Sequence, residues 1–200
     1  PSLSTMILPS LITIGINPDN NNNGLTMYDN GGMPLTEVSM PLLQSIEGLV
    51  RFMNMNSLET LNFPNLNTVG MFFWVDQCPV LSTLDCTSLA SVGGNFTINY
   101  APLLTTVAGL PALETVGGTL DISSTGISNV DPWAASLESV NGILIYKNQA
   151  LTSLAGLEGL GSVTPLEMSG DLIINNNDNI TFKNLPDLSG IRQIQGSLKI

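Results

Sequence analysis

Histidine is missing from the chain altogether, and only 10% of its 200 residues are charged. The lack of histidine removes the commonest general base and metal ligand, and every Ser-His-Asp or Cys-His catalytic arrangement. Five basic residues face sixteen acidic ones, and the net charge of -11 argues against binding to a nucleic-acid phosphate backbone. Long apolar runs are also lacking, since a membrane-spanning helix needs roughly 20 such residues. We therefore predict no nucleic-acid partner and no transmembrane segment.

Charge is also too scarce for ordinary helix surfaces, because soluble proteins usually devote about a quarter of their residues to Asp, Glu, Lys and Arg. Asparagine, serine, threonine and glycine fill the polar positions instead. No apolar stripe with helical spacing persists along the chain. At 43% hydrophobic, 200 residues can still bury one good-sized core. We expect one domain over residues 1–200, with little helix.

A repeated phrase dominates what is present. Its form is Leu-x-x-[Leu/Val]-x-apolar-Pro-x-Leu-x-x-Val-Gly-Gly-x-Leu-x-Ile. Alignment of every copy on the closing Leu-x-Ile gives eight apolar pairs, 23 to 28 residues apart: Leu25/Met27, Val50/Phe52, Phe73/Val75, Phe96/Ile98, Leu120/Ile122, Leu144/Tyr146, Leu172/Ile174 and Leu198/Ile200. A period of about 24 residues lies within the range of leucine-rich repeats.

Each pair alternates with an outward residue, which is typical of a strand with one buried face. Glycines near the strands permit corners, and prolines break any helix between them. The sequence predicts a right-handed parallel β-solenoid of about eight coils. Hydroxyl side chains should stack beside the core at Thr13, Ser45, Thr68, Ser91, Thr115, Ser139 and Ser162. Since no polar or disulfide-bonded caps are written at either end, we expect a segment of a longer protein.

Three copies of the phrase resemble a known family: PALETVGGTLDIS, SLASVGGNFTIN and NLNTVGMFFWVD. They are similar to the repeats of receptor L domains, the leucine-rich-like solenoids of insulin- and epidermal-growth-factor-type receptors. They resemble still more closely the fungal GPI-anchored cell-wall proteins of the sporulation-specific type, and similar repeats occur in protist and bacterial surface proteins. The resemblance spans essentially the whole chain. It implies an extracellular, non-enzymatic surface module, although the capping cysteines of the receptor domains are missing here.

The two cysteines, Cys78 and Cys86, allow two interpretations. Cys86 occupies an inward position and Cys78 follows a strand, so both can be buried or turn thiols, because free cysteine behaves as a small hydrophobe. A local disulfide that staples one coil is the alternative, and it would suit an oxidising compartment. Two cysteines without histidine make a zinc site a poor fit, and we predict neither a metal nor a cofactor.

Two N-glycosylation sequons begin at Asn95 and Asn179. Chance produces such triplets readily in a chain this rich in Asn, Ser and Thr, so the sequons alone prove nothing. Asn95 is nevertheless expected on the outward face of a strand, where a glycan can be accommodated. With the family resemblance, this position leads us to expect an extracellular glycoprotein.

Catalytic chemistry finds no support in the pattern of acidic residues. Asp76, Asp121 and Asp171 take outward strand positions, but in different columns or distant coils. Acid-base catalysis needs partners held within hydrogen-bond reach. We therefore predict that the chain is not an enzyme.

Outward apolar residues are the remaining signal. They gather in two groups, one in coils two and three and one in coils six and seven: Leu49, Arg51, Met53, Phe72 and Trp74, and Ile143, Ile145 and Ile173. The first group pairs a cation with an indole one coil apart, the composition of a protein-binding hot spot. The alternative is a patch covered by a neighbouring loop or by a glycan at Asn95.

These observations lead to two hypotheses of different classes. The first is a non-catalytic cell-surface module that binds a protein or a glycan through its strand face. The second is a structural building block of a surface fibre, filament or cell wall, which associates with copies of itself through outward apolar patches.

Overall fold

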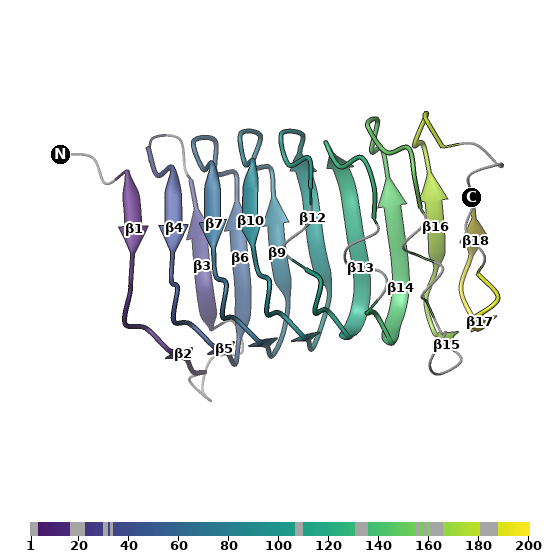
Figure 1. Cartoon of the computed structure of the whole chain (residues 1–200), viewed down its shortest axis with the longest axis horizontal. Coiled ribbons are helices and arrows are strands. Elements are labelled where there is room, and N and C mark those ends of the chain that lie inside the picture. The colour runs from purple at the N-terminus through teal and green to yellow at the C-terminus, as the bar shows by residue number, and fades with distance from the viewer. Residues whose placement is uncertain are drawn as a thin grey trace.

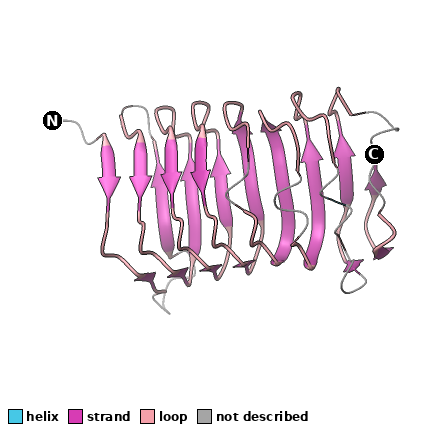
Figure 2. Cartoon of the chain, in the orientation of Figure 1, coloured by secondary structure: helices cyan, strands magenta, loops and turns pink. Residues whose placement is uncertain are grey.

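The computed structural model is a β-solenoid built almost entirely of short strands (Figures 1 and 2). The structure describes residues 4–16, 23–29, 32, 34–106, 110–130, 136–154, 157, 160, 166–180 and 188–200. Among these residues no α-helix is present, as the sequence predicts. All strand pairs are parallel, because each turn brings the chain back in the same direction beside the turn before it.

Eight strands form the long face, which carries the outward residues between the predicted apolar pairs. They are β3 (Gly24–Tyr28), β6 (Leu49–Met53), β9 (Phe73–Asp76), β12 (Phe96–Ala101), β13 (Thr115–Thr125), β14 (Ser139–Tyr146), β16 (Leu172–Asn175) and β18 (Leu198–Lys199). Backbone pairing runs through them in that order. The strands lie across the longest axis of the molecule (Figure 1).

The other strands complete the turns. A four-stranded sheet holds β1 (Thr5–Ile7), β4 (Glu37–Ser39), β7 (Thr60–Asn62) and β10 (Thr83–Asp85). A third row holds β2 (Thr13–Ile14), β5 (Ser45–Ile46), β8 (Thr68–Val69) and β11 (Ser91–Val92). A separate pair joins β15 (Leu166–Met168) to β17 (Ile191–Ile194). The third row carries the predicted hydroxyl column from Thr13 to Ser139 in register, and the predicted Ser162 lies outside the described residues.

The strands β13 and β14 span two rows. The first residues of β13 pair with β11, whereas its later residues pair with β12. β13 and β14 then pair with each other over both rows, with a shift in register between Val116 and Thr119. The third row and the long face are thereby joined into one twelve-stranded sheet.

The solenoid has about six turns, slightly fewer than the eight coils that the sequence predicts. Among the described residues, six that lie one turn apart take the same left-handed backbone conformation at or just after the ends of long-face strands, with φ between 52° and 57°: Asn54, Gln77, Tyr100, Ser124, Lys147 and Asn176. At the last predicted pair, Leu198 is 62% exposed, because β18 has a paired neighbour on one side only. Eight strand pairs therefore do not make eight closed turns.

The predicted apolar columns form the core from the first through the fifth coil. Val50, Phe73, Phe96 and Leu120 are fully buried in consecutive strands. Phe73 and Phe96 stack with their ring centroids 4.9 Å apart. Burial of one such ring removes a large apolar area from water, so this column contributes strongly to the stability of the solenoid.

In the sixth coil the predicted alternation is wrong by one residue. Ile143 and Ile145, which the sequence places outside, are fully buried and pair with Leu120 and Ile122. Leu144 is half-buried on the outward side. The cause is a shorter corner: Gly142 stands opposite Thr119, so β14 reaches the core one residue sooner than its sequence alignment suggests.

Stacked glycines fill a corner before the long face. A Cβ atom on Gly93 would overlap the carbonyl oxygen of Gly70, and one on Gly117 would overlap that of Gly93. Close approach of successive backbones, rather than an unusual φ angle, therefore requires glycine at this corner.

Candidate functional site

The outward column of the long face carries the most varied chemistry of the molecule. Backbone pairing places the following residues side by side, one strand apart: Thr26, Arg51, Trp74, Thr97, Asp121, Leu144, Ile173 and Lys199. The sequence predicts this column except at the sixth place, where Leu144 stands instead of Ile145. A cation, an indole, a small hydroxyl and a carboxylate thus follow one another.

Arg51 and Trp74 form the predicted cation–π contact. The guanidinium carbon lies over the indole, 5.3 Å from the ring centroid. The Nη1 group of Arg51 donates a hydrogen bond of 2.7 Å to the hydroxyl oxygen of Tyr28 on β3. Its buried Nε finds no acceptor among the described residues. The cation–π contact and the hydrogen bond to Tyr28 fix the guanidinium over one face of the indole. The cation–π attraction there is worth about 0.5–2 kcal/mol.

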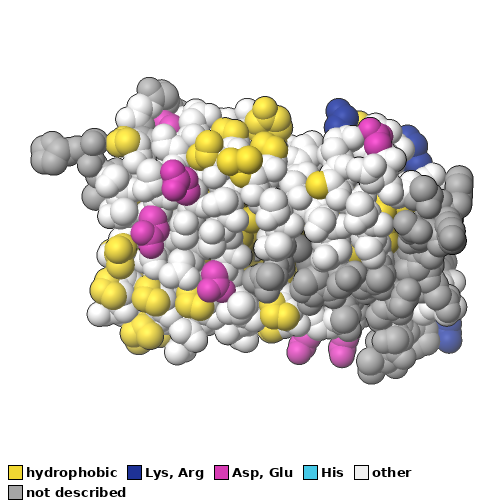
Figure 3. All heavy atoms as spheres, turned by 45° about the horizontal axis from the view of Figure 1, so that its top comes forward, with side chains coloured by type: hydrophobic (Ala, Val, Ile, Leu, Met, Phe, Trp, Pro, Cys, Tyr) yellow, Lys and Arg dark blue, Asp and Glu magenta, His cyan; other side chains and the backbone are white. Residues whose placement is uncertain are grey.

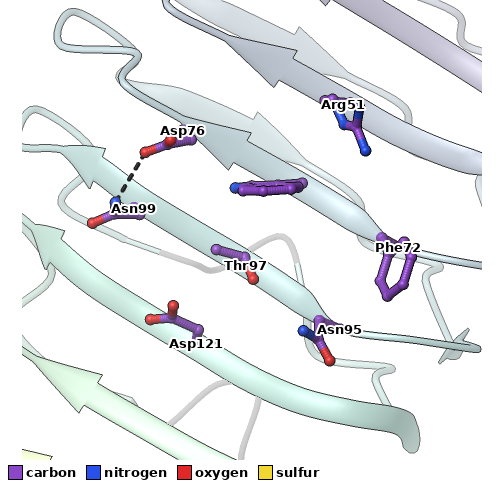
Figure 4. Close-up of a pocket in the computed structure, with 8 residues that line it drawn as sticks. Arg51, Phe72, Asp76, Asn95, Thr97, Asn99 and Asp121 are labelled. Atoms are coloured by element: carbon purple, nitrogen blue, oxygen red, sulfur yellow. Dashed lines mark hydrogen bonds between the residues drawn. The ribbon is translucent and has the colours of Figure 1, made fainter.

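Beside this pair the long face is hollowed (Figure 4). The strand-face hollow has a volume of about 360 Å³ and is lined by Arg51, Phe72, Trp74, Asp76, Asn95, Thr97, Asn99 and Asp121. Figure 4 shows that these side chains rise from four neighbouring strands or the residues just before them. Because every lining strand is held in a continuous ladder, the side chains are positioned before any ligand arrives.

Hydrogen bonds hold the polar wall in place. Asn99 Nδ2 donates to Asp76 Oδ1 over 2.9 Å, the contact drawn in Figure 4. The hydroxyl of Ser123 donates a short hydrogen bond to Asp121 Oδ1. The backbone N–H of Thr119 donates to Asn95 Oδ1 over 3.0 Å. Asp76, Asn95 and Asp121 each accept one oriented internal hydrogen bond, Asn99 donates one, and all four keep further hydrogen-bonding capacity.

The Asp121 carboxyl is partly withdrawn from water. Burial raises its pKa above the usual aspartate value, the hydrogen bond from Ser123 opposes this rise, and the nearby negative charge of Asp76 adds to it. Desolvation is the largest of the three causes, which is typical of a carboxylate in a hollow with apolar walls.

Two of the three outward carboxylates that the sequence treats as scattered meet in this hollow. Asp76 and Asp121 both line it, because Asp76 lies two residues farther along its strand and two strands away. Asp171 lies apart and accepts a hydrogen bond of 2.6 Å from the backbone N–H of Ser197. The sequence analysis missed Asp76, Thr97, Asn99 and Asp121 as one group. Extending the column alignment to the residue two positions later would have revealed it.

The predicted partner-binding residues divide into three sets. Arg51, Phe72 and Trp74 line the hollow, and Met53 is half-buried on the strand that carries Arg51. Leu49, which pairs with Gly24, is only 1% exposed and offers no surface to a partner. In the predicted second group, Ile143 and Ile145 are buried in the core. Ile173 lies on the outward face as predicted, where it pairs with Leu144.

In the structure the thiols of Cys78 and Cys86 are both free and buried, and no disulfide joins them. Burial is the main cause that raises the pKa of Cys78 to about 11. Burial likewise raises the pKa of Cys86. Both cysteines therefore act as small core residues in their protonated form.

Both sequon asparagines are exposed. Asn95 stands at the rim of the strand-face hollow, whereas Asn179 donates a hydrogen bond of 2.6 Å to the carbonyl oxygen of Gln149. The Thr181 that completes the second sequon lies outside the described residues.

A second hollow lies on the third row and differs in chemistry. It measures about 460 Å³ and is lined by Gln44, Ser45, Asn65, Asn67, Thr68 and Ser88. Its walls carry amides and hydroxyls but neither an aromatic ring nor a charge. Within the described part of the chain, no group of three or more Cys, Asp or Glu side chains is placed to hold a metal ion.

No helix in the described ranges is long and apolar enough to cross a membrane. In comparisons with family models, curated proteins and solved structures, no match to the chain is found.

Proposed function

We propose that the chain is a non-catalytic, extracellular interaction module that binds a protein or glycan partner through its long strand face. The observation that carries the proposal is the strand-face hollow, where an indole, a guanidinium and two carboxylates converge. Such a concave site with a few oriented polar groups and an aromatic wall is typical of ligand recognition.

The rigidity of the solenoid supports a binding role. The lining residues belong to consecutive strands of one ladder, so little conformational entropy is lost when a partner binds. Trp74 and Arg51 belong to the residue types that contribute most at binding hot spots. Phe72, which is exposed beside them, extends the apolar part of the surface.

The carboxylates are held in a fixed arrangement that supports binding. Asp76 and Asp121 are two strands and two residues apart. One oxygen of each is held by a hydrogen bond from a neighbouring side chain, Asn99 or Ser123, so the other oxygen is positioned to accept from a ligand.

The extracellular location rests on the resemblance of the repeat to receptor L domains and cell-wall proteins. The exposed Asn95 and Asn179 are compatible with a glycoprotein. The scarcity of charge, with polar positions filled by Asn, Ser and Thr, is compatible with it as well.

A second candidate function is that of a structural block that associates with itself. The observation that favours it is a group of exposed apolar side chains on and beside β1 and β2: Ile7, Leu8, Ile12 and Ile16. Figure 3 shows yellow apolar side chains in separate groups on one face, and the basic side chains visible in that view lie toward the end opposite β1 and β2. Apolar clusters of this kind are unusual on a protein that stays monomeric.

The test compares three proteins: the parent chain, Trp74→Ala and Leu103→Ala. Leu103 is 53% exposed and lies outside the hollow, so its variant matches the loss of an exposed apolar side chain. Each protein is applied to immobilised glycans and to a displayed peptide library, and retention is quantified. Light scattering over a range of concentrations reports self-association.

The proposal expects retention on glycans or peptides that Trp74→Ala reduces about tenfold and Leu103→Ala leaves unchanged. Retention that is equal in all three proteins would place the interface elsewhere and contradict the strand-face proposal. Absence of retention together with concentration-dependent polymers would replace it with the structural function. Release of reducing sugar from any bound glycan would contradict the non-catalytic part.

A further inference from the structure

We infer that the ligand of the strand-face hollow is a neutral saccharide, whose ring lies against the free face of Trp74 above Thr97. This inference rests on the proposed binding function and names the chemical class of its ligand. The geometry of the column, the hydrogen-bonding capacity of the wall and the distribution of charge each support it.

The first step concerns the two faces of the indole. Arg51 lies on the strand at one side of Trp74, and Thr97 lies on the strand at the other side. Because the guanidinium covers one ring face, the opposite face is directed toward Thr97. An indole face carries negative electrostatic potential and attracts weakly positive groups such as the C–H bonds of a sugar ring.

The second step concerns the room above Thr97. Thr97 has a short side chain and stands between Trp74 and Asp121 in the outward column. Two strand spacings separate those larger neighbours, a distance of about 10 Å. A gap walled on one side by an indole and on the other by a carboxylate suits a flat ring that is apolar on its face and polar at its edge. The 360 Å³ hollow lies within the usual range of ligand sites.

Several hydrogen-bond donors and acceptors of the hollow are not used by the internal contacts. Asn99 uses its amide N–H, so its Oδ1 remains an acceptor. Asp76 and Asp121 each keep a second carboxylate oxygen as an acceptor. Asn95 uses its Oδ1, which leaves its NH₂ group as a donor. The wall is therefore rich in acceptors, and a ligand with many hydroxyl donors fits it best.

The fourth step concerns charge. Two carboxylates in the hollow repel an acidic saccharide, and the molecule as a whole carries a net charge of -11. The carboxylates attract a cation, whereas Arg51, which already lies over one face of the indole, repels a second cation on the other face. Charge therefore disfavours acidic ligands, and the indole face together with the acceptor-rich wall favours a neutral saccharide over a cation.

The sequon at Asn95 determines how the protein must be produced for the binding experiment. An N-linked glycan is attached through the same side-chain nitrogen that would donate to the ligand, at the rim of the hollow. The protein is therefore produced in bacteria, without N-glycans, so that this donor is free.

Binding is measured by calorimetry with cellohexaose, laminarihexaose, mannohexaose and chitohexaose as neutral probes. Oligogalacturonate serves as the anionic probe and hexalysine as the cationic one. The proteins are the parent chain, Trp74→Ala, Thr97→Phe and Leu103→Ala. Thr97→Phe fills the gap and keeps both Trp74 and Arg51, and phenylalanine is well suited to a strand, so it tests the site even where Trp74→Ala lowers the thermal midpoint.

We expect at least one neutral probe to bind the parent chain and Leu103→Ala with equal affinity. The same probe should bind Trp74→Ala and Thr97→Phe at least about tenfold more weakly. Failure of every neutral probe overturns the inference, and so does binding that Thr97→Phe does not weaken. Stronger binding of hexalysine or oligogalacturonate than of any neutral probe overturns it as well. If the test with immobilised glycans and displayed peptides shows retention on peptides alone, and Trp74→Ala reduces that retention, the saccharide inference fails and the proposed binding function stands.

Discussion

At the scale of single residues, Asn148 is a polar residue in the core whose side chain makes several hydrogen bonds. Its side chain is fully buried, and Oδ1 accepts hydrogen bonds from the backbone N–H and the hydroxyl of Thr125, over 2.9 and 2.7 Å. Nδ2 donates to the carbonyl oxygen of Ile122 over 2.8 Å. Asn177 repeats the arrangement one turn later, where its Oδ1 accepts from the N–H of Asn148. The two amides form a short ladder along the solenoid.

We predict that Asn148→Ala lowers the free energy of unfolding by about 3 kcal/mol or more. It leaves buried groups of Thr125 and Ile122 unpaired, at a cost of about 1–3 kcal/mol each. Chemical denaturation measures the change. The matched control is Gln149→Ala, an exposed neighbour expected to stay within about 0.5 kcal/mol. Equal stability of the two variants would contradict a role for the ladder.

The buried thiols predict how stability depends on pH. The pKa of Cys78 rises from 9.0 to about 11 on folding, so the folded state holds this proton more tightly than the unfolded state does. The resulting stabilisation is complete below pH 9 and is lost as the pH rises toward 11. Denaturation curves between pH 8 and 11 should therefore show falling stability, with a shallower slope in Cys78→Ala. An unchanged slope in that variant would contradict the prediction.

At the scale of elements, the corners at the ends of the long-face strands repeat one backbone conformation at six places in the described part of the chain. None of the six residues there is glycine, although a left-handed conformation costs a residue with a Cβ atom about 1–2 kcal/mol. The sequence analysis attributed the corners to glycines. The structure confirms glycine where backbones approach closely, at Gly93, and shows that the opposite corner uses other residues.

Gln77→Gly should stabilise the protein by about 0.5–1 kcal/mol. Glycine removes the strain of the left-handed conformation at an exposed corner, and the gain exceeds its greater freedom in the unfolded chain. Gln77→Ala keeps the Cβ atom and is expected to bring no gain. Thermal unfolding of both variants separates strain from loss of the glutamine side chain. A glycine variant no more stable than the alanine variant would show that the corner is unstrained.

In the sixth coil, the local sequence does not determine which residues of the strand face the core. The run from Ile143 to Tyr146 is apolar or aromatic at all four positions, so its alternation does not say which residues face the core. In the fifth coil Asp121 between two apolar residues settles the same question. The phase of β14 is decided by the register shift at the preceding corner, a tertiary feature that local pattern does not contain.

At the scale of the whole molecule, stability should be distributed unequally along the column. Phe96 is fully buried between Phe73 and Leu120, and Phe96→Ala should lower the free energy of unfolding by about 3–5 kcal/mol through the cavity left behind. Leu198 occupies the equivalent position in β18 but is exposed. We expect Leu198→Ala to change stability by less than about 0.5 kcal/mol. Similar losses in the two variants, measured in urea, would contradict this difference.

The repeat period and the apolar pairs were enough to predict the solenoid and the pairing of Arg51 with Trp74, because both follow from stacking identical turns. The hollow was not predicted as a site, since it depends on the small size of Thr97 between larger neighbours and on two diagonal carboxylates. Column alignment compares residues at one position, whereas a ligand site joins several positions.

The twelve-stranded sheet has a mechanical consequence. The strands lie across the long axis, so tension along that axis pulls directly on the hydrogen bonds between turns (Figure 1). One turn of about 24 residues can then peel away at a time, and each releases about 80 Å of extended chain. Earlier turns pair through separate short strands in each row, whereas β13 and β14 run unbroken through both rows and must separate along their whole length. Under load, the chain should therefore lengthen in steps and yield last at the β13–β14 seam.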